Sequence, residues 1–196
     1  MPARVILWDL MDTLVRDPFF THVPAFFGCS FEALVPQLLP GTWVDFELGK
    51  LREEELYARF FRDRRAFDGP GLKRCMYGAY AWVDGAESLL QELAARDVPM
   101  HALSNYPDWY KLVEERLGVS RYVNLSFVSC HTGLRKPAPE AFLNACATLA
   151  CTPEQCLLVD DREQNCRAAR ALGLDALHFD GRVDVLRQAF VDRSLL

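Results

Sequence analysis

Short runs of consecutive apolar residues alternate along the chain with longer stretches in which apolar residues recur every three or four positions. The short runs predict buried β-strands, and the longer stretches predict amphipathic helices. The expected strands are residues 5–8, 98–103, 125–130, 156–159 and 176–179, and the expected helices are residues 86–96, 108–117, 139–149 and 162–172. This alternation indicates an α/β fold with a doubly wound parallel sheet and right-handed crossovers.

The ends of the expected helices carry residues that favour helix boundaries. Asp84 is suited to cap the helix of residues 86–96. Pro139 fits the first turn of its helix, because the amide hydrogen that proline lacks would have no helical partner there. Gly118 and Gly173 fit the C-terminal ends of two others. These residues support the boundaries that the apolar pattern gives.

Residues 18–83 interrupt the alternation. They hold 14 of the 23 aromatic residues of the chain. We expect a small helical unit inserted after the first strand, because a unit with few residues needs large side chains to form a core. Some of these aromatics could also line a site for a flat ring. The chain then divides into a core of residues 1–17 and 84–196 and a helical cap of residues 18–83.

Composition and charge limit the partners. With 196 residues, 51% of them hydrophobic, the chain can bury an α/β core and one small accessory unit. A net charge of -5 and a pI near 5.4 argue against nucleic acid or an anionic membrane as the main partner. An anionic substrate must therefore meet a locally positive pocket.

The seven cysteines form no CxxC pair, and most lie in apolar segments. This predicts reduced thiols in a soluble protein of a reducing compartment. No apolar run approaches the length needed to span a membrane. The first four residues lead directly into the first strand, so we expect no signal or transit segment in this sequence.

The first expected strand ends in an acidic residue, Asp9, and continues as Leu10-Met11-Asp12-Thr13. The carboxyl end of a central strand is where α/β proteins place their chemistry. A carboxylate there can attack an electrophile or hold a metal, and Thr13 adds a hydroxyl group close by. Met11 stands where a second carboxylate would be expected, two residues after the first.

Three later segments place polar side chains at other strand ends. Ser104 and Asn105 can hydrogen-bond the oxygens of an anion, although this pair is also ordinary turn chemistry. Lys136 precedes a helix that begins with proline, where the ammonium group and the helix N-terminus can both face negative charge, although a surface lysine is the simpler alternative.

Asp160 and Asp161 end a wholly apolar strand. Two carboxylates that converge on Asp9 would repel each other unless a cation neutralised them, which implies a hard, oxygen-preferring ion such as Mg²⁺. The alternative, in which Asp161 only caps the next helix, leaves Asp160 unexplained.

The order of these four segments resembles the four signature motifs of the haloacid dehalogenase-like (HAD) hydrolase superfamily. The resemblance covers nearly the whole chain and implies a Rossmann-like core with the first strand central and an inserted helical cap of the type called C1. It implies that Asp9 is the nucleophile, that Ser104 with Asn105 binds the transferring phosphoryl group, and that Lys136 neutralises this group. The implied ligands of Mg²⁺ are Asp9, the backbone carbonyl of Met11, Asp160 and Asp161.

Most phosphatases of this superfamily carry the pattern DxDxT, whose second Asp protonates the leaving alcohol and then activates water. Met11 can do neither, and losing a general acid/base typically costs roughly 10²- to 10⁴-fold in rate. Asp12 could substitute if the chain makes a helical turn after the strand, because residues three apart then share a face. Asp12 is therefore a third candidate catalytic residue, beside Asp9 and Lys136.

Two other interpretations of Met11 remain open. The protein could act like a 2-haloacid dehalogenase, which needs no metal because Asp attacks carbon and halide leaves unprotonated; Asp160 and Asp161 argue against this. It could also be a catalytically impaired ligand-binding protein. The retention of every other motif makes that the weakest of the three interpretations.

Four segments, residues 8–19, 23–27, 105–110 and 135–137, look like the flavin mononucleotide (FMN) hydrolases of plant and algal chloroplasts. That group also has Met after the nucleophile. The resemblance implies Mg²⁺-dependent hydrolysis of FMN to riboflavin and phosphate, through an aspartyl-phosphate on Asp9, in a chloroplast. Tyr106 and Trp109 are then candidates to stack on the isoalloxazine ring, or they pack the helix that follows. The expected partner is this small phosphate ester, and the sequence does not indicate an oligomeric state.

Overall fold

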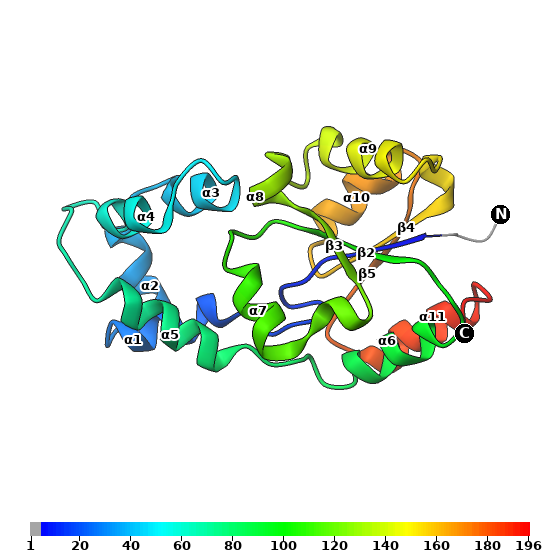
Figure 1. Cartoon of the computed structure of the whole chain (residues 1–196), viewed down its shortest axis with the longest axis horizontal. Coiled ribbons are helices and arrows are strands. Elements are labelled where there is room, and N and C mark those ends of the chain that lie inside the picture. Colours follow the sequence, from blue (N-terminus) through cyan, green and yellow to red (C-terminus); the bar gives the residue numbers. More distant parts are fainter. Residues whose placement is uncertain (1–4) are drawn as a thin grey trace.

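A parallel five-stranded sheet forms one half of the computed structural model, which describes residues 5–196 (Figure 1). Residues 1–4, which the sequence assigns to the start of the core, lie outside the described residues. The strands are β1 (Val5–Trp8), β2 (Met100–Ser104), β3 (Asn124–Val128), β4 (Cys156–Asp160) and β5 (Asp175–His178), in the order β3-β2-β1-β4-β5. The Rossmann-like α/β fold class is thus confirmed, with β1 at the centre.

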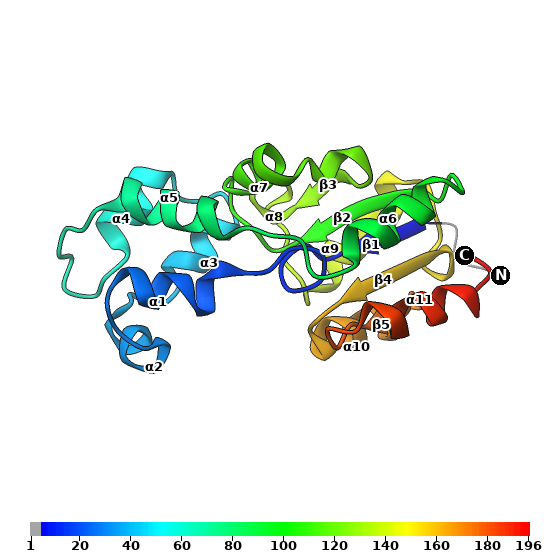
Figure 2. The ribbon, with the colours of Figure 1, turned by 90° about the horizontal axis from the view of Figure 1, so that it is seen from below.

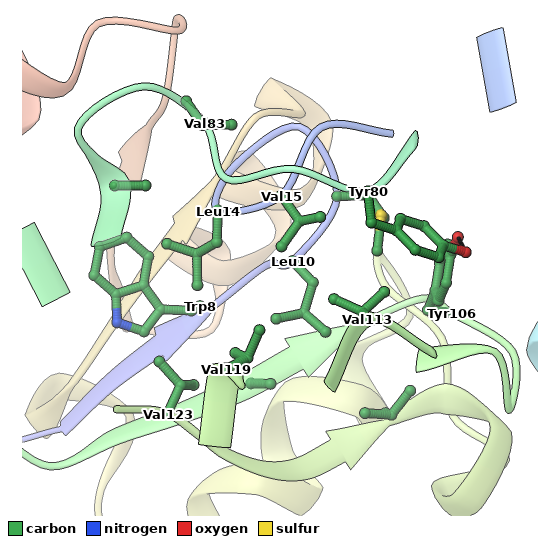
Figure 3. Packing of buried hydrophobic residues seen from close by; sticks show 14 of the residues in the cluster. Trp8, Leu10, Leu14, Val15, Tyr80, Val83, Tyr106, Val113, Val119 and Val123 are labelled. Carbon is green, nitrogen blue, oxygen red and sulfur yellow. Dashed lines mark hydrogen bonds between the residues drawn. The ribbon is translucent and has the colours of Figure 1, made fainter. Parts of the chain in front are cut away.

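Helices cover both faces of this sheet. They are α6 (Ala86–Ala94), α7 (Tyr110–Leu117), α8 (Ser129–Thr132), α9 (Pro139–Thr148), α10 (Glu163–Ala171) and α11 (Val183–Val191). Successive side chains of a strand point to opposite faces. Ile6 and Trp8 therefore pack in one cluster with residues of α6, α7 and α11, whereas Leu7 packs in the other with residues of α9 and α10. Figure 3 shows the first cluster around Trp8.

The helix boundaries follow most of the sequence signals, but α8 begins at Ser129, inside the strand that was predicted for residues 125–130. Pro139 and Gly118 stand where they were expected, at a first turn and at a C-cap. The prediction for Asp84 is wrong, because Gly85 takes the N-cap position of α6 with φ 83° and the Asp84 carboxylate pairs with Arg16 at 3.0 Å. Helix α11 was not predicted, although the spacing of its buried residues is helical.

Residues 18–80 form a separate group of short helices. These are η1 (Pro18–Phe20), α1 (His22–Phe26), α2 (Phe31–Leu34), η2 (Val35–Gln37), α3 (Thr42–Glu47), α4 (Glu53–Arg59) and α5 (Gly69–Ala79). They gather at the end of the molecule opposite the C-terminus (Figures 1 and 2). Many of the aromatics in this group contact one another; the Phe27 ring lies 5.1–5.7 Å from the rings of Phe60, Phe61 and Phe67. Most of them therefore form a core.

Two linkers join this helical group to the sheet, and they run side by side. The Arg16 amide donates to the Ala81 carbonyl at 2.9 Å, and the Val83 amide donates to the Leu14 carbonyl at 2.9 Å. The chain therefore leaves and re-enters the sheet layer beside the end of β1. Within residues 5–196, the structure contains no helix with the length and apolar character needed to cross a membrane.

Candidate active site

The carboxyl ends of the three middle strands bring the sequence-predicted residues together. Asp9 follows β1, Ser104 ends β2 and Asp160 ends β4, and all three side chains are buried. The Asp9 amide donates to the Val159 carbonyl at 2.9 Å, which extends the β1–β4 pairing past the strand and fixes the direction of the chain. Parallel register thus places polar groups that are 56 to 151 positions apart in the sequence at one edge of the sheet.

Lys136 is buried between two of these carboxylates. Its Nζ lies 2.9 Å from Asp9 Oδ1 and 2.6 Å from Asp160 Oδ2, and the residue is 2% exposed. Burial alone would lower the pKa of the Lys136 ammonium, but the two carboxylates outweigh burial and raise this pKa above its ordinary value. The site therefore holds a fixed positive charge, but the carboxylates around it outnumber it, so an anionic substrate would need a further cation there.

The backbone of Lys136 is held by Asn105. The Lys136 amide donates to Asn105 Oδ1 at 2.8 Å, and Asn105 Nδ2 donates to the Lys136 carbonyl at 2.8 Å. Asn105 was predicted to bind phosphate directly. Its oxygen and one amide hydrogen are bonded to the Lys136 backbone and so position the lysine, and its contact with phosphate stays a prediction. Sequence spacing could not reveal this contact between residues that are 31 positions apart.

Three carboxylates form a cluster that could hold a metal. The carboxylate oxygens of Asp9, Asp160 and Asp161 lie within 4.8 Å of one another. Burial, together with the negative charges of Asp9 and Asp160, raises the pKa of Asp161 to about 7. Asp161 Oδ1 is buried without a hydrogen-bond partner among residues 5–196. Several carboxylate oxygens close together, at least one of them without a hydrogen-bond partner, form a set of oxygen ligands that fits Mg²⁺.

Asp160 and Asp161 differ in how many hydrogen bonds their carboxylates already accept. Asp160 accepts from the Arg162 amide at 2.9 Å, from Lys136, and from Asn165 Nδ2 at 2.9 and 3.0 Å. Asp161 is held instead through its backbone, whose amide donates to Thr13 Oγ1 at 3.1 Å. Asp161 is thus the more available metal ligand, and Asp160 mainly holds Lys136. Asn165 was missed by the sequence analysis.

Ser104 ends β2 at the same edge of the sheet, although it is not among the residues that line the cleft described below. Its Oγ is buried and has no hydrogen-bond partner among the residues that the structure describes. A buried polar atom without a partner carries a cost of about 1–3 kcal/mol, so such atoms point to a missing ligand. The hydroxyl group can donate to an oxygen of a bound anion.

A small cleft of about 40 Å³ lies above these groups. Its volume admits only a few water-sized groups, which suits one small anion. The lining residues are Asp9, Met11, Asp12, Asp17, Trp43, Glu47, Asn105, Tyr106, Lys136, Arg162 and Asn165. Trp43 and Glu47 come from α3, so the helical group of residues 18–80 contributes one wall.

Helix α3 contacts the core through Glu47. Arg135 Nε donates to Glu47 Oε2 at 2.7 Å, and Ser129 Oγ donates to the Glu47 carbonyl at 2.5 Å. Burial raises the pKa of the Glu47 carboxyl, and the Arg135 guanidinium partly opposes this rise. No sequence pattern indicates a role for Glu47, because a single acid in a short helix does not show which way it faces.

Asp12 lies at the rim of the cleft. Its expected role required a helical turn after β1. A hydrogen bond of 2.9 Å from the Leu14 amide to the Leu10 carbonyl does close a turn, but Asp12 has φ 55°, outside the right-handed helical region. The helical premise therefore fails. Asp12 is exposed, and its Oδ1 accepts from the Asp17 amide at 2.9 Å. Its catalytic role stays a prediction.

Tyr106 and Trp109 are both packed in the interior, each 2% exposed. The Tyr106 and Tyr80 hydroxyls are hydrogen-bonded at 2.8 Å, and Figure 3 shows the two side chains together. Trp109 Nε1 donates to Glu53 Oε2 at 2.9 Å, and its ring meets Phe46 edge-on at 5.4 Å. Both residues are packed, but Tyr106 also lines the cleft and Trp109 lines a second pocket beside Glu53 and Lys73. Their stacking on a ligand therefore stays a prediction.

An apolar pocket of about 260 Å³ adjoins the cleft at Trp43. Its walls include Phe19, Leu38, Leu39 and Phe60, and the rings of Phe19 and Trp43 lie 4.8 Å apart. The volume is near the lower end of the ~300–1,000 Å³ typical of small-molecule pockets. The site thus combines a charged cleft for a small anion with an apolar pocket for a larger group.

Comparisons with known proteins agree with this geometry. Residues 3–173 match the model of a hydrolase family described as haloacid dehalogenase-like hydrolase. The chain is 45% identical over 176 residues to Flavin mononucleotide hydrolase 1 of the Arabidopsis thaliana chloroplast, a match that covers 90% of this chain and 72% of that protein. It is 34% identical over 122 residues to the ribulose-1,5-bisphosphate 5-phosphatase of Halopiger xanaduensis, covering 59% of this chain and 51% of that protein.

Solved structures share the fold at low identity. A HAD family enzyme of Bacteroides thetaiotaomicron, in complex with magnesium and inorganic phosphate, has a TM-score of 0.73 at 21% identity, covering 91% of this chain and 95% of that one. The L-2-haloacid dehalogenase of Xanthobacter autotrophicus has a TM-score of 0.67 at 17% identity, covering 96% and 82%. The fold alone therefore does not separate a phosphatase from a dehalogenase.

Proposed function

The chain belongs to the haloacid dehalogenase-like hydrolase family, and from this premise we propose that it is a Mg²⁺-dependent phosphatase that hydrolyses FMN to riboflavin and phosphate. The observation that carries the proposal is the acidic cluster of Asp9, Asp160 and Asp161 around Lys136. A halide leaves without such a cluster, whereas a phosphate ester must have its charge masked before a carboxylate can attack it. The 45% identity to the Arabidopsis FMN hydrolase supports FMN as the ester.

Asp9, the Met11 carbonyl and Asp161 would hold the Mg²⁺, with Asp160 assisting, and the ion would mask charge on the phosphoryl oxygens. Lys136 neutralises a further phosphoryl oxygen, and the Ser104 hydroxyl donates to another. The Asp9 carboxylate then attacks phosphorus as the bond from phosphorus to the alcohol oxygen breaks, which gives an aspartyl-phosphate. Water attacks this intermediate and releases phosphate and free Asp9.

Residues 18–83 serve in this proposal as a cap over the core of residues 1–17 and 84–196. Trp43 and Glu47 support it, because they reach from α3 to the wall of the cleft. The phosphate then lies in the cleft and the isoalloxazine ring lies in the apolar pocket beyond Trp43. By analogy with the Arabidopsis relative, the proposed location is the chloroplast.

A panel of phosphate esters tests this function. FMN should give a higher kcat/KM than phosphoglycolate, sugar phosphates or nucleotides, and EDTA should abolish turnover until Mg²⁺ is added back. Asp9→Asn should be inactive, because the amide is not a nucleophile. Full turnover in EDTA would support the dehalogenase hypothesis instead, and a flat profile across the panel would mean that the cap does not select flavin.

A further inference from the structure

The proposed reaction lacks an assigned proton donor. The alcohol oxygen of FMN leaves as a poor, strongly basic group unless it is protonated, and Met11 cannot supply a proton. Besides Asp9, three acidic residues line the cleft: Asp12, Asp17 and Glu47. The donor must be sought among them, because a general acid has to reach the leaving oxygen directly or through one water.

Two of the three acids are poorly suited. Glu47 is already bonded to the Arg135 guanidinium at 2.7 Å, so a proton on this carboxyl would weaken an ion pair that joins α3 to the core. Asp12 is exposed, and its φ of 55° takes it out of the helical turn that its expected role required.

Asp17 differs from both in its surroundings. It lies on the linker from β1 into the helical group, between the Arg16–Ala81 backbone hydrogen bond and the buried Pro18. Its Oδ1 accepts from the Phe19 amide at 2.9 Å and so caps η1, which fixes the side chain. Within residues 5–196, Asp17 forms no ion pair and its Oδ2 accepts no hydrogen bond. One carboxyl oxygen is thus anchored and the other is free in the wall of the cleft.

We propose that Asp17 is the general acid that protonates the leaving alcohol, and then the general base that activates water, in place of the residue that Met11 replaces. The inference rests on the proposed phosphatase function. In the first step the Asp17 proton moves to the ester oxygen as the bond from phosphorus to this oxygen breaks. In the second step Asp17 takes a proton from the water that attacks phosphorus, and the Asp9 carboxylate is released. Asp17 ends protonated, so the cycle closes.

The charges around Asp17 agree with this role. Burial raises the pKa of Asp17 to about 6, the Asp12 and Asp9 carboxylates raise it as well, and the Phe19 amide and the Arg162 guanidinium oppose the rise. The other titratable groups that interact with it are the Tyr80 and Tyr106 hydroxyls, whose own pKa values burial raises. A general acid is most effective when its pKa lies near the working pH.

The test compares two leaving groups in the full-length protein. Asp17→Asn keeps a side-chain oxygen that can accept from the Phe19 amide, so η1 stays capped. We expect its kcat/KM for FMN to fall by about 10²- to 10⁴-fold, and its kcat/KM for p-nitrophenyl phosphate to fall by less than about tenfold, because nitrophenolate leaves unprotonated. The aryl ester should also give a burst of nitrophenolate and an accumulated phosphoenzyme, because the second step has lost its base.

Asp84→Asn is the matched control. It removes an exposed carboxylate from the other linker, 93% exposed at its side chain, and both esters should be hydrolysed as by the wild type. Equal losses of kcat/KM on both esters in Asp17→Asn would overturn the proposal. So would a loss selective for FMN in Asp12→Asn with none in Asp17→Asn. The alkyl phosphate used in this test is the one that the wild type hydrolyses fastest. If the wild type does not hydrolyse FMN, the proposed function is overturned, and the role of Asp17 is tested on that other ester.

Discussion

The Lys136 ammonium lies 2.9 Å from the Asp9 carboxylate, and their side chains are only 1% and 10% exposed. A buried ion pair contributes little relative to an apolar core, but removal of one partner leaves the other charge uncompensated. In Lys136→Gln, both Asp9 and Asp160 lose their cation. We expect the free energy of unfolding at pH 7 to fall by about 3–5 kcal/mol in chemical denaturation, with phosphatase activity lost.

Lys111→Gln provides the comparison, because Lys111 Nζ lies 2.7 Å from Asp108 at a surface position where its side chain is 60% exposed. We expect the loss of this exposed pair to change the free energy of unfolding much less than Lys136→Gln does. Equal effects of the two substitutions would contradict the enclosure of Lys136.

Asp9, Ser104, Lys136 and Asp161 were predictable from sequence because each follows a recognisable apolar strand or precedes a helix that begins with proline. In a parallel sheet these strand ends must converge. The same logic cannot show how a polar side chain is used once it is there. Asn105 holds the Lys136 backbone, a contact that depends on the exact path of a loop 31 residues away.

The helical group was predictable as a unit, but its contributions to the site were not. Its aromatics are needed for packing and for binding alike, so composition does not separate the two uses. Trp109 is packed against Phe46, whereas Trp43 reaches the cleft. The difference depends on how α3 docks on the core through Glu47 and Arg135, which are 88 positions apart.

Trp43 should determine affinity for the flavin ring, because it lines both the cleft and the apolar pocket. Trp43→Ala removes one wall, so we expect KM for FMN to rise by about tenfold, the equivalent of ~1.4 kcal/mol of aromatic contact. KM for p-nitrophenyl phosphate, which has a smaller leaving group, should change less. Steady-state kinetics on both esters measures this.

The control for Trp43 is Trp82→Ala, a half-buried tryptophan whose ring lies 6.4 Å from Tyr122 and lines neither cavity. It should leave the ratio of the two KM values unchanged. If Trp43→Ala also left this ratio unchanged, the isoalloxazine ring would not lie against Trp43.

Glu47 and Arg135 should be energetically coupled, because their bond joins α3 to the loop that carries Lys136. Arg135→Gln leaves a buried carboxylate unpaired, so we expect it to lower the free energy of unfolding more than Glu47→Gln does. A double-mutant cycle in urea should give a coupling energy of about 1–3 kcal/mol. The exposed pair of Lys50 and Asp45, 3.9 Å apart, should give less than about 0.5 kcal/mol. Additive effects of Glu47→Gln and Arg135→Gln would mean that the contact does not hold α3.

Asp17 should make the stability of the protein depend on pH in a direction opposite to that of most carboxylates. Burial raises the pKa of Asp17 from 3.8 to about 6, so between these two values the folded protein holds a proton that the unfolded chain has released. Stability therefore falls as pH rises through this window, and the penalty is fully present above about pH 6. Below about pH 4 both states are protonated and the penalty disappears.

Asn mimics the protonated acid and carries no such penalty. Asp17→Asn should therefore be more stable than the wild type by about 1–3 kcal/mol at pH 8 and nearly equal to it at pH 4, as thermal melts would show. Asp180→Asn should behave in the opposite sense, because the hydrogen bond from Arg182 lowers the pKa of Asp180 and stabilises its charged form above the acidic range. If the stability difference between Asp17→Asn and the wild type did not change between pH 4 and 8, Asp17 would not hold a proton near neutral pH. Both experiments therefore examine the same property of Asp17, which is its tendency to keep a proton in the folded protein. The stability curve measures this tendency directly, and the leaving-group comparison measures the transfer of that proton to the substrate.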